Sequence, residues 1–393
     1  MSINPKINLG TSHSNISIGR AANITDIEKL LHQIQLNNFE DDSSAAMTLK
    51  LATHKSSGIL SDIWTAMAVG TICRHCFPKC IVKAWGINKL REDFEETEFA
   101  KSLPGLVAIQ MARSVISDNE KSVVDQSRIE QIISRDRFGI FEASGGKTRT
   151  LCEFDPQQPL ALALSEINSA TSIEDRHRLF RHLILQFRAN LEIGGTKRKI
   201  SPVDAGPVRY ITTFLNELHD NAFEHGRMDP SKQNKLRFLR FKKHISTNRD
   251  DLLERASQFI PLYEYLSEVT RGAGAEAIIE ASVSDFGLGI IDHFLNSDHG
   301  TKFTKTDRRS LLDNILLEKL SAKGGDPGAG QGISKALVAA KRMSAFVSLR
   351  TGEFWVAQSY ADPNAPVPLQ NVQQQPVAPV IGTHWQIILP QPL

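Results

Sequence analysis

Apolar residues near the start of the chain recur at helical spacing. An amphipathic helix is predicted by residues that lie three and four positions apart, namely Ile27, Leu30, Leu31 and Ile34. Thr25 and Glu28 match the pattern of a capping box, so we expect this helix to begin at Thr25. A longer apolar stretch predicts a second helix from Ser61 to about Phe77, where Pro78 ends it.

The same region contains a strand-like run and further helical patterns. The segment CIVKAW, from Cys80 to Trp85, is typical of a strand, and helical patterns follow Asp93 and Leu103. These segments predict an N-terminal α/β region of unknown fold over residues 1–155. Nothing in them indicates a reaction.

The C-terminal part begins with helical periodicity and ends with strands. Ser172 is placed to cap a helix whose apolar residues recur every fourth position, namely Leu179, Leu183, Phe187 and Leu191. A strand is expected from Ala277 to Val283, and two final strands from Ala345 to Leu349 and from His384 to Leu389. The segment 361–379 is rich in proline and glutamine, which is typical of an extended, exposed loop.

Composition limits the class of protein more than it limits the function. The 393 residues are 41% hydrophobic and 23% charged, as in globular proteins of two or three domains. A net charge of +2 does not indicate a nucleic-acid partner, because phosphate binding depends on local basic clusters. The apolar stretch 63–73 is too short to span a bilayer, and the polar N-terminal residues lack the apolar core of a secretion signal. Four cysteines do not make a disulfide framework, so we expect a cytoplasmic protein with free thiols.

The first chemical motif lies in the segment VRYITTFLNELHDNAFEHG, where Pro207 suits the first turn of a helix. Its buried stripe is predicted to consist of Val208, Ile211, Leu215, Leu218 and Ala222. Glu217 and Asn221 lie four residues apart on the shoulder of that stripe, so both side chains point into the same cleft. A carboxylate there can deprotonate water, and an amide oxygen can ligate Mg²⁺. The alternative is a pair of solvated polar residues on an ordinary amphipathic helix.

The second motif is IIEASVSDFGLGI, a strand-like run that ends in Asp285 and is followed by Gly287 and Gly289. A carboxylate at a strand end can accept a hydrogen bond from the exocyclic amine of adenine. The glycines allow the backbone to approach the ring closely. The alternative is a strand followed by a tight turn.

The third motif is KGGDPGAGQGISKALVAAKRM, a glycine-rich segment with a helix that begins near Ile333. Backbone N–H groups at a helix N-terminus bind anions, so triphosphate oxygens fit here. The segment is not a Walker P-loop, because no Lys-Ser/Thr pair follows its last glycine, and its spacing does not fit a dinucleotide fingerprint. The alternative is a mobile surface loop.

The order of the motifs is more specific than any one of them. A helix with E-x-x-x-N, a strand with D-x-G-x-G, a G-x-G-x-G lid and a strand beginning G-T occupy residues 207–226, 277–290, 321–345 and 382–390. In this order the chain resembles the GHKL superfamily of ATP-binding domains, which takes in gyrase, heat-shock chaperone, histidine kinase and MutL types. The nearest local likeness is to anti-sigma factor kinases, whose N-A-x-x-H-G pattern matches residues 221–226.

The resemblance implies a role for each matching polar residue. Asn221 resembles the magnesium ligand, and Glu217 resembles the residue that polarises the attacking group. Asp285 resembles the aspartate that reads adenine, and Thr383 resembles the threonine that supports this aspartate.

The resemblance also implies roles for the glycines and a fold. Gly287 and Gly289 would shape the base pocket. Gly328, Gly330 and Gly332 would close a lid over the phosphates. Lys323, at the start of this lid, is either a substitute phosphate partner or a solvated loop lysine. Residues 156–393 are therefore expected to form a two-layer α/β sandwich of the Bergerat type. Such a domain has a mixed sheet with helices on one face and binds ATP and Mg²⁺.

Two features depart from the family pattern. A long spacer between the first two motifs carries the basic run Lys235 to Lys243, which predicts an inserted element, most simply a strand with a solvated face. Glu224 occupies the position where histidine kinases often carry a lysine, which weakens that phosphate contact.

Two further groups of residues allow other functions, namely metal binding and a phosphoacceptor histidine. Spacing compatible with zinc is found in one cluster, which consists of Cys73, His75, Cys76 and Cys80. A second C-x₂-C pair is missing there, and cysteine also packs as a small hydrophobic residue. His177 and His182 lie where a histidine kinase carries its phosphoacceptor, but without the motif that surrounds it.

The leading functional hypothesis is an ATP-dependent conformational switch. ATP and Mg²⁺ bind, the lid closes, contacts with the N-terminal region or a partner change, and slow hydrolysis by Glu217 resets the protein. One alternative is a protein kinase that transfers the γ-phosphate to a partner protein, and another is an interaction module that binds ATP without turnover. We expect a protein partner or a homo-oligomer and no membrane insertion. The sequence does not separate the hypotheses, because E-x-x-x-N serves kinases and ATPases alike.

Overall fold

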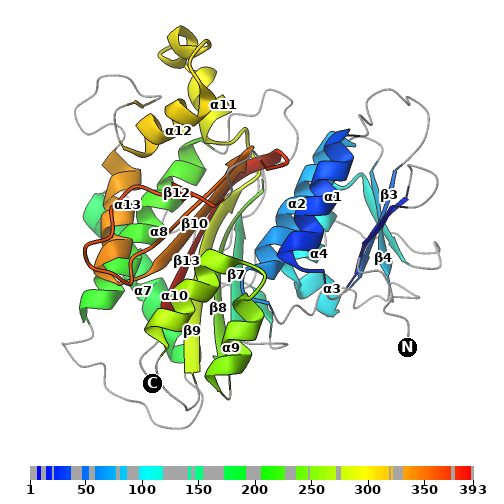
Figure 1. Cartoon of the computed structure of the whole chain (residues 1–393). Helices are drawn as coiled ribbons and strands as arrows, with labels where there is room; N and C mark the ends of the chain where they lie inside the picture. The colour runs from blue at the N-terminus through cyan, green and yellow to red at the C-terminus, as the bar shows by residue number, and fades with distance from the viewer. Residues whose placement is uncertain are drawn as a thin grey trace.

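The computed structural model has an α/β fold with two sheets and several layers of helices, so the predicted fold class is confirmed (Figure 1). It describes residues 7–9, 15–19, 22–36, 47–52, 58–76, 80–85, 97–117, 140–142, 147–153, 172–191, 205–225, 236–246, 248–270, 276–317, 320–321, 331–372 and 377–390.

A five-stranded sheet forms the N-terminal part, in the spatial order β1 to β5. Its strands are β1 (Ile7–Leu9), β2 (Asn15–Ile18), β3 (Thr48–Ala52), β4 (Ile81–Trp85) and β5 (Ser114–Ser117). Strands β2 to β5 pair in parallel, and β1 pairs antiparallel to β2. Parallel neighbours need crossover connections. These contain α1 (Ile24–Leu36), α2 (Ser61–His75), α3 (Glu98–Lys101) and α4 (Leu103–Met111).

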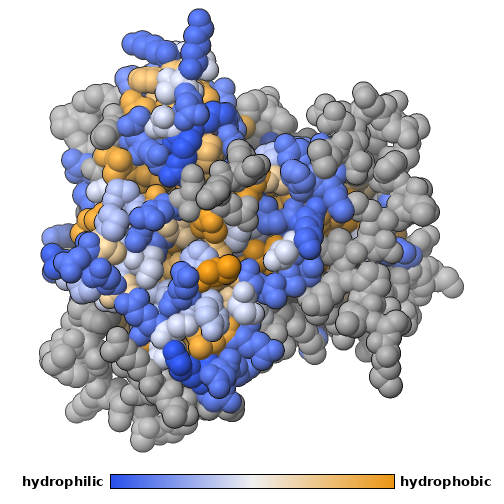
Figure 2. All heavy atoms as spheres, in the orientation of Figure 1, coloured by the Kyte–Doolittle hydropathy of each residue, from blue (hydrophilic) through white to orange (hydrophobic). Residues whose placement is uncertain are grey.

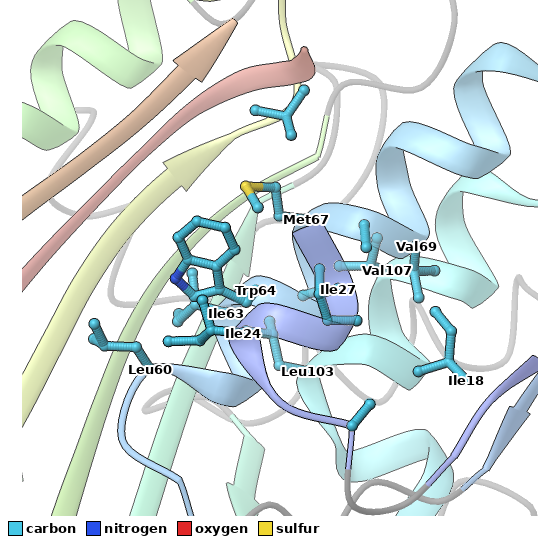
Figure 3. Packing of buried hydrophobic residues seen from close by; sticks show 14 of the residues in the cluster. Ile18, Ile24, Ile27, Leu60, Ile63, Trp64, Met67, Val69, Leu103 and Val107 are labelled. Carbon is cyan, nitrogen blue, oxygen red and sulfur yellow. The ribbon is translucent and has the colours of Figure 1, made fainter. Parts of the chain in front are cut away.

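Helix α2 lies between the two sheets. Every residue from Ser61 to Cys73 is buried, because the helix is apolar nearly all round rather than along one stripe. In Figure 3, Leu60 and Trp64 point toward the larger sheet, and Val69 lies on the opposite side, toward Ile18. The rings of Trp64 and Trp355 pack with centroids 4.3 Å apart, which joins α2 to the larger sheet.

The larger sheet has eight strands in the order β12-β11-β10-β13-β9-β8-β7-β6. They are β6 (Ile140–Glu142), β7 (Lys147–Glu153), β8 (Arg237–Ser246), β9 (Glu276–Asp285), β10 (Phe346–Gly352), β11 (Phe354–Ser359), β12 (Gln370–Asn371) and β13 (Val380–Pro390). The resemblance implied a mixed sheet, but each pairing of these described strands is antiparallel. The connections explain this difference. A tight turn at Glu353 joins β10 to β11, and two short helices bring the chain back to the end where β8 stops.

Helices cover both faces of the larger sheet, whereas the resemblance implied one. One face packs against α7 (Ile173–Leu191), α8 (Ala205–His225), α11 (Ile290–Leu295), α12 (Arg308–Leu316) and α13 (Gln331–Arg342). The other face packs against α9 (Arg249–Ala256), α10 (Ile260–Val269), α1 and α2. Side chains alternate between these layers, so Val347 packs on the first face and Phe346 on the second. The N-terminal helices are therefore an inner layer of the molecule.

The boundary between the two sheets differs from the one expected at residue 155. Strands β6 and β7 precede that residue, yet β7 pairs with β8 from Glu153↔Arg237 to Lys147↔Lys243. The larger sheet therefore begins by Ile140. The sequence KTRTLCE of β7 lacks a clear alternation of apolar and polar residues, which explains why the pattern did not assign it.

Most elements with strong periodicity lie close to their predicted ranges, but their ends and surroundings differ. Helix α1 is capped by Asn23 rather than Thr25, because Oδ1 of Asn23 accepts a hydrogen bond from the Asp26 amide at 2.9 Å. The segment expected to be an exposed loop packs back onto the protein, since Ala365 and Leu369 are buried.

The surface is largely hydrophilic on the face drawn in Figure 2, with apolar residues gathered near its middle, around α10. Helix α10 contributes two exposed apolar side chains, Ile260 and Tyr263. Among the described residues, no helix combines the length and apolar composition needed to cross a bilayer.

Candidate functional site

Helix α8 presents the first pair of candidate residues. Its buried stripe is the predicted one, formed by Val208, Ile211, Leu215, Leu218 and Ala222. Glu217 and Asn221 lie beside this stripe and are both partly buried. The shoulder position that the spacing predicted is therefore confirmed, and the two side chains are not simply solvated.

The first turn of α13 meets these two side chains. A Cβ on Gly332 would lie 3.0 Å from Oε2 of Glu217 and 3.5 Å from Nδ2 of Asn221. The missing side chain of this glycine therefore lets the N-terminus of α13 approach both groups. Within the described residues, Nδ2 of Asn221 is buried and has no hydrogen-bond partner. A polar head group without a partner at a helix N-terminus is suited to a bound ligand.

The charge of Glu217 is tuned by its surroundings. Burial raises the pKa of its carboxyl group, the cation of Lys335 on α13 lowers it, and the neighbouring Asp220 raises it again. The net direction is upward, so this carboxylate is a better proton acceptor than a solvated glutamate. Lys335 was not singled out in the sequence, because it follows the glycine motif within an ordinary amphipathic helix.

The second group lies at the end of β9. Asp285 is buried, and its Oδ1 accepts a hydrogen bond from the backbone N–H of Gly287 at 2.9 Å. Thr383 of β13 is its register partner and donates to it from both its backbone N–H and its side chain. Burial raises the pKa of Asp285 to about 6, although these hydrogen bonds and the charge of Arg237 lower it. Thr383 therefore lies beside Asp285, as the resemblance implied.

Two glycines allow the backbone to pack closely around Asp285. Gly382 has φ +76°, and a Cβ there would lie 1.9 Å from the carbonyl oxygen of Asp285. Gly289 has φ +84°, and its Cβ would lie 2.9 Å from Oγ1 of Thr351. Both positions require glycine. Gly289 was predicted from its motif, and Gly382 could have been found from the G-T pair at the start of the last strand.

A small gap in the packing has no room for a water molecule. It lies between α8 and strands β8 and β9, and is lined by His219, Ala222, Arg237, Phe238, Leu239, Val283 and Ser284. Ala222 follows Asn221, and Ser284 precedes Asp285, so the lining includes chain neighbours of both groups, although Asn221 and Asp285 do not line the gap themselves.

The basic run differs from its prediction. The predicted strand is confirmed as β8, but its basic side chains are buried rather than solvated. Arg240 forms an ion pair with Asp62 of α2, and Nζ of Lys242 lies 2.7 Å from the same carboxylate. Arg237 lies beside Asp285, on the opposite face of the strand. The run thus faces Asp285 and α8 on one side and the N-terminal helices on the other.

Several candidate positions fall outside the site or outside the described residues. Lys323, Gly328 and Gly330 lie in a segment that the structure does not describe. His177 lies next to Asn216, with its Nε2 3.5 Å from the amide nitrogen, and His182 is exposed.

The cysteine cluster packs inside the N-terminal part. Sγ of Cys73 and Sγ of Cys80 lie 3.7 Å apart, and Sγ of Cys76 lies 3.0 Å from Sδ of Met47. Burial and the neighbouring thiol raise the pKa of Cys76 to about 12. Among the described residues, no group of three or more His, Cys, Asp and Glu side chains is arranged to hold a metal ion.

Comparison with known proteins adds no family. No family model matches the chain, and no match was found among curated proteins or among solved structures.

Proposed function

We propose that this protein binds ATP and Mg²⁺ beside α8, the N-terminus of α13 and the ends of β9 and β13, and acts as an ATP-dependent switch. One observation carries the proposal. Glu217, Asn221 and Gly332 meet where α8 contacts the first turn of α13, and Asp285, Thr383 and the close-packed Gly382 meet where β9 pairs with β13. These residues belong to four separated motifs in the order in which the GHKL superfamily carries them.

The polar groups near Asn221 suit Mg²⁺, a hard cation that would be held mainly by the phosphate oxygens of a bound nucleotide. Mg²⁺ keeps several waters and takes one or two protein oxygens together with phosphate oxygens. The amide of Asn221 would supply the protein oxygen. Its amide nitrogen is buried without a hydrogen-bond partner among the described residues, which supports a ligand contact at this side chain. Bound Mg²⁺ would neutralise charge on the phosphates. Free backbone N–H groups in the first turn of α13 would bind phosphate oxygens.

The remaining residues provide base recognition and proton transfer. Asp285 would accept a hydrogen bond from the exocyclic amine of adenine while Thr383 holds the carboxylate in place. Oε2 of Glu217 would take the proton of an attacking water, and its raised pKa favours this step. Slow hydrolysis would then return the protein to the nucleotide-free state.

The switch would be transmitted through α2. Phe286 follows Asp285 directly and packs against Gly70, where a Cβ would lie 2.3 Å from its ring. The N–H of Ile381, two residues before Thr383, donates to Oγ1 of Thr71 at 3.3 Å. Both chain segments that would hold the base therefore also touch the N-terminal part. A ligand that moves these segments changes the packing of α2.

Nucleotide titration tests the proposal directly. Mg·ATP should bind and raise the melting temperature, Mg·GTP should bind more weakly, and Asn221→Ala should remove the magnesium dependence. The nearby Asn216→Ala is the matched control, because Asn216 lies five residues earlier on the same helix, next to His177 of α7, and is expected to leave binding unchanged. If folded wild-type protein shows no binding or stabilisation by ATP with or without Mg²⁺, the proposal is wrong.

The fate of the γ-phosphate separates the proposal from its alternatives. With γ-labelled ATP, slow release of free phosphate that Glu217→Gln abolishes supports a switch reset by hydrolysis. Label on a partner protein would indicate a kinase. Bound ATP without release or transfer would indicate an interaction module. The Glu217→Gln protein should still bind ATP, because its magnesium and base contacts come from other residues.

A further inference from the structure

A continuous row of polar residues crosses the larger sheet at the end of β9, beside the proposed base site. Arg237 of β8 is in register with Asp285 of β9, Asp285 with Thr383 of β13, and Thr383 with Thr351 of β10. Directly opposed residues of antiparallel strands point to the same face. This is the face that α8 covers, because Leu239, Val283 and Trp385, two residues along each strand, pack with that helix.

The row buries one cation beside one carboxylate. Arg237 is 3% exposed and Asp285 is 6% exposed, and Arg237 also lines the gap itself. An ionised carboxylate removed from water is unfavourable unless hydrogen bonds and an opposite charge compensate it. Gly287 and Thr383 provide the hydrogen bonds. Arg237 provides the opposite charge. It lies on β8, which pairs with β9 on the side away from Thr383.

We propose that Arg237 keeps Asp285 ionised at neutral pH and thereby sets the preference of the site for adenine over guanine. This inference rests on the proposed ATP function. An ionised Asp285 accepts a hydrogen bond from the amine of adenine and repels the carbonyl oxygen of guanine. A protonated Asp285 donates a hydrogen bond instead, so it accepts guanine and the preference is lost. Arg237 acts through Asp285 and is therefore a positioning residue.

Other charged and titratable groups surround the gap and define the controls. His219 faces it from α8, with Glu217 and Asp220 on the same helix and Lys335 on α13. On the far side of Arg237, its register partner on β7 is Glu153. A pH dependence that arises from His219 would survive in an Asp285→Asn protein, whereas one that arises from Asp285 would disappear. That comparison assigns the titrating group.

The main test measures ATP and GTP binding between pH 5 and pH 8.5. Wild-type affinity for ATP should fall as the pH drops through the pKa of Asp285, about 6. Arg237→Gln should move this midpoint upward by about one pH unit and lower the ATP-to-GTP ratio at pH 7, with recovery at pH 8.5. Arg237→Lys keeps the charge and should keep the wild-type ratio. An unchanged midpoint in Arg237→Gln, or an equal loss of ATP binding at every pH, overturns the proposal.

A double variant covers the case in which Arg237→Gln does not fold. Arg237→Gln with Asp285→Asn removes both buried charges, so neither is left uncompensated. Its ATP-to-GTP ratio should equal that of Asp285→Asn alone and should not change with pH. A further loss in the double variant would mean that Arg237 contacts the base itself, and the proposed action through Asp285 would be wrong.

A measurement without nucleotide separates this inference from the proposed function. The carboxyl carbon of Asp285 can be followed by NMR in ¹³C-aspartate-labelled, nucleotide-free protein and assigned by its loss in Asp285→Asn. Its midpoint should rise in Arg237→Gln and stay in Arg237→Lys. An unchanged midpoint contradicts the role of Arg237 even when ATP binds. A shifted midpoint in a protein that binds no ATP upholds the charge effect and rejects the base preference together with the proposed function.

Discussion

Asp285 combines a proposed role in ligand recognition with a position that opposes folding. Its pKa in the folded protein is about 6, above the value of 3.8 for a free side chain, mainly because of burial. Between these two values the folded state binds more protons than the unfolded state, so stability falls as the pH rises through this window. The carboxylate therefore destabilises the folded protein at neutral pH.

We predict that Asp285→Asn stabilises the nucleotide-free protein at pH 7 while it weakens ATP binding. The shift from 3.8 to about 6 corresponds to a gain on the order of 3 kcal/mol at pH 7, which disappears below about pH 4. Urea unfolding at the two pH values measures the gain, with Asp313→Asn on α12, a partly exposed aspartate, as the control. If Asp285→Asn destabilises the protein at pH 7, Arg237 compensates the buried charge completely.

The sequence predicted the residues whose chemistry is local and missed those whose role depends on a neighbour. Asp285 and Thr383 stand in recognisable motifs, and their pairing follows once β9 and β13 are neighbours. Arg237 was assigned to a solvated strand, because alternation along KLRFLRFKK does not reveal that helices cover both faces of β8. The effect of Lys335 on the pKa of Glu217 likewise becomes visible only once α13 is packed against α8.

Among the helices and strands, α1 has two possible capping boxes at its N-terminus, and only one of them forms. The pairs Asn23–Asp26 and Thr25–Glu28 both have the spacing of a capping box. In the structure, Asn23 and Asp26 exchange both hydrogen bonds, at 2.9 and 3.2 Å. Glu28 instead reaches Arg350 on β10, 3.3 Å away. The sequence could place this helix but not its first residue, because the choice depends on a contact with a strand far along the chain.

We predict that Asn23→Ala lowers the free energy of unfolding by about 1 kcal/mol, because it removes the acceptor for the Asp26 amide. Thr25→Ala is the matched control and should change stability little, since Thr25 is exposed and caps no amide of this turn. Chemical denaturation of both variants measures the difference. Equal losses in the two proteins would contradict the assignment of Asn23 as the cap.

In the whole molecule, the two sheets are joined by buried charges on α2 and β8. Asp62 pairs with Arg240 and Lys242, and Glu280 of β9 accepts a hydrogen bond from the Leu60 amide at 3.2 Å. Glu280 also lies 2.7 Å from Nε2 of His244. Asp62 and Lys242 are 180 positions apart, so no local pattern could reveal their contact. Buried polar contacts of this kind fix one arrangement of the layers.

We predict that Asp62→Ala destabilises the protein by about 3–5 kcal/mol, because it removes the carboxylate that two buried cations, Arg240 and Lys242, share. Asp313→Ala is the control, since its pair with Arg309 is partly exposed and should contribute less than about 1 kcal/mol. Equilibrium unfolding, followed by circular dichroism, compares the two variants. A loss as small as that of the control would mean that water reaches Arg240 and Lys242 in solution.

The contact between α2 and the proposed base site leads to a last prediction. It concerns communication between the N-terminal part and the larger sheet. Gly70 contacts Phe286, the residue after Asp285, so the Cβ of Gly70→Ala would meet the ring at 2.3 Å and displace it. We predict that this variant binds Mg·ATP about tenfold more weakly, although α2 contributes no residue to the gap. Calorimetric titration of the folded variant measures the change.

The control and the reverse experiment decide how this effect is interpreted. Val69→Ala lies on the same helix but toward the smaller sheet, so it should lower the melting temperature without changing ATP affinity (Figure 3). Coupling is reciprocal, so ATP should also change the hydrogen exchange of α2 in the wild-type protein. If Gly70→Ala binds ATP as tightly as the wild type, and ATP leaves the exchange of α2 unchanged, the base site does not communicate with the N-terminal part. The proposed switch would then require another route, because the contacts of Phe286 and Ile381 with α2 are the ones proposed to carry it.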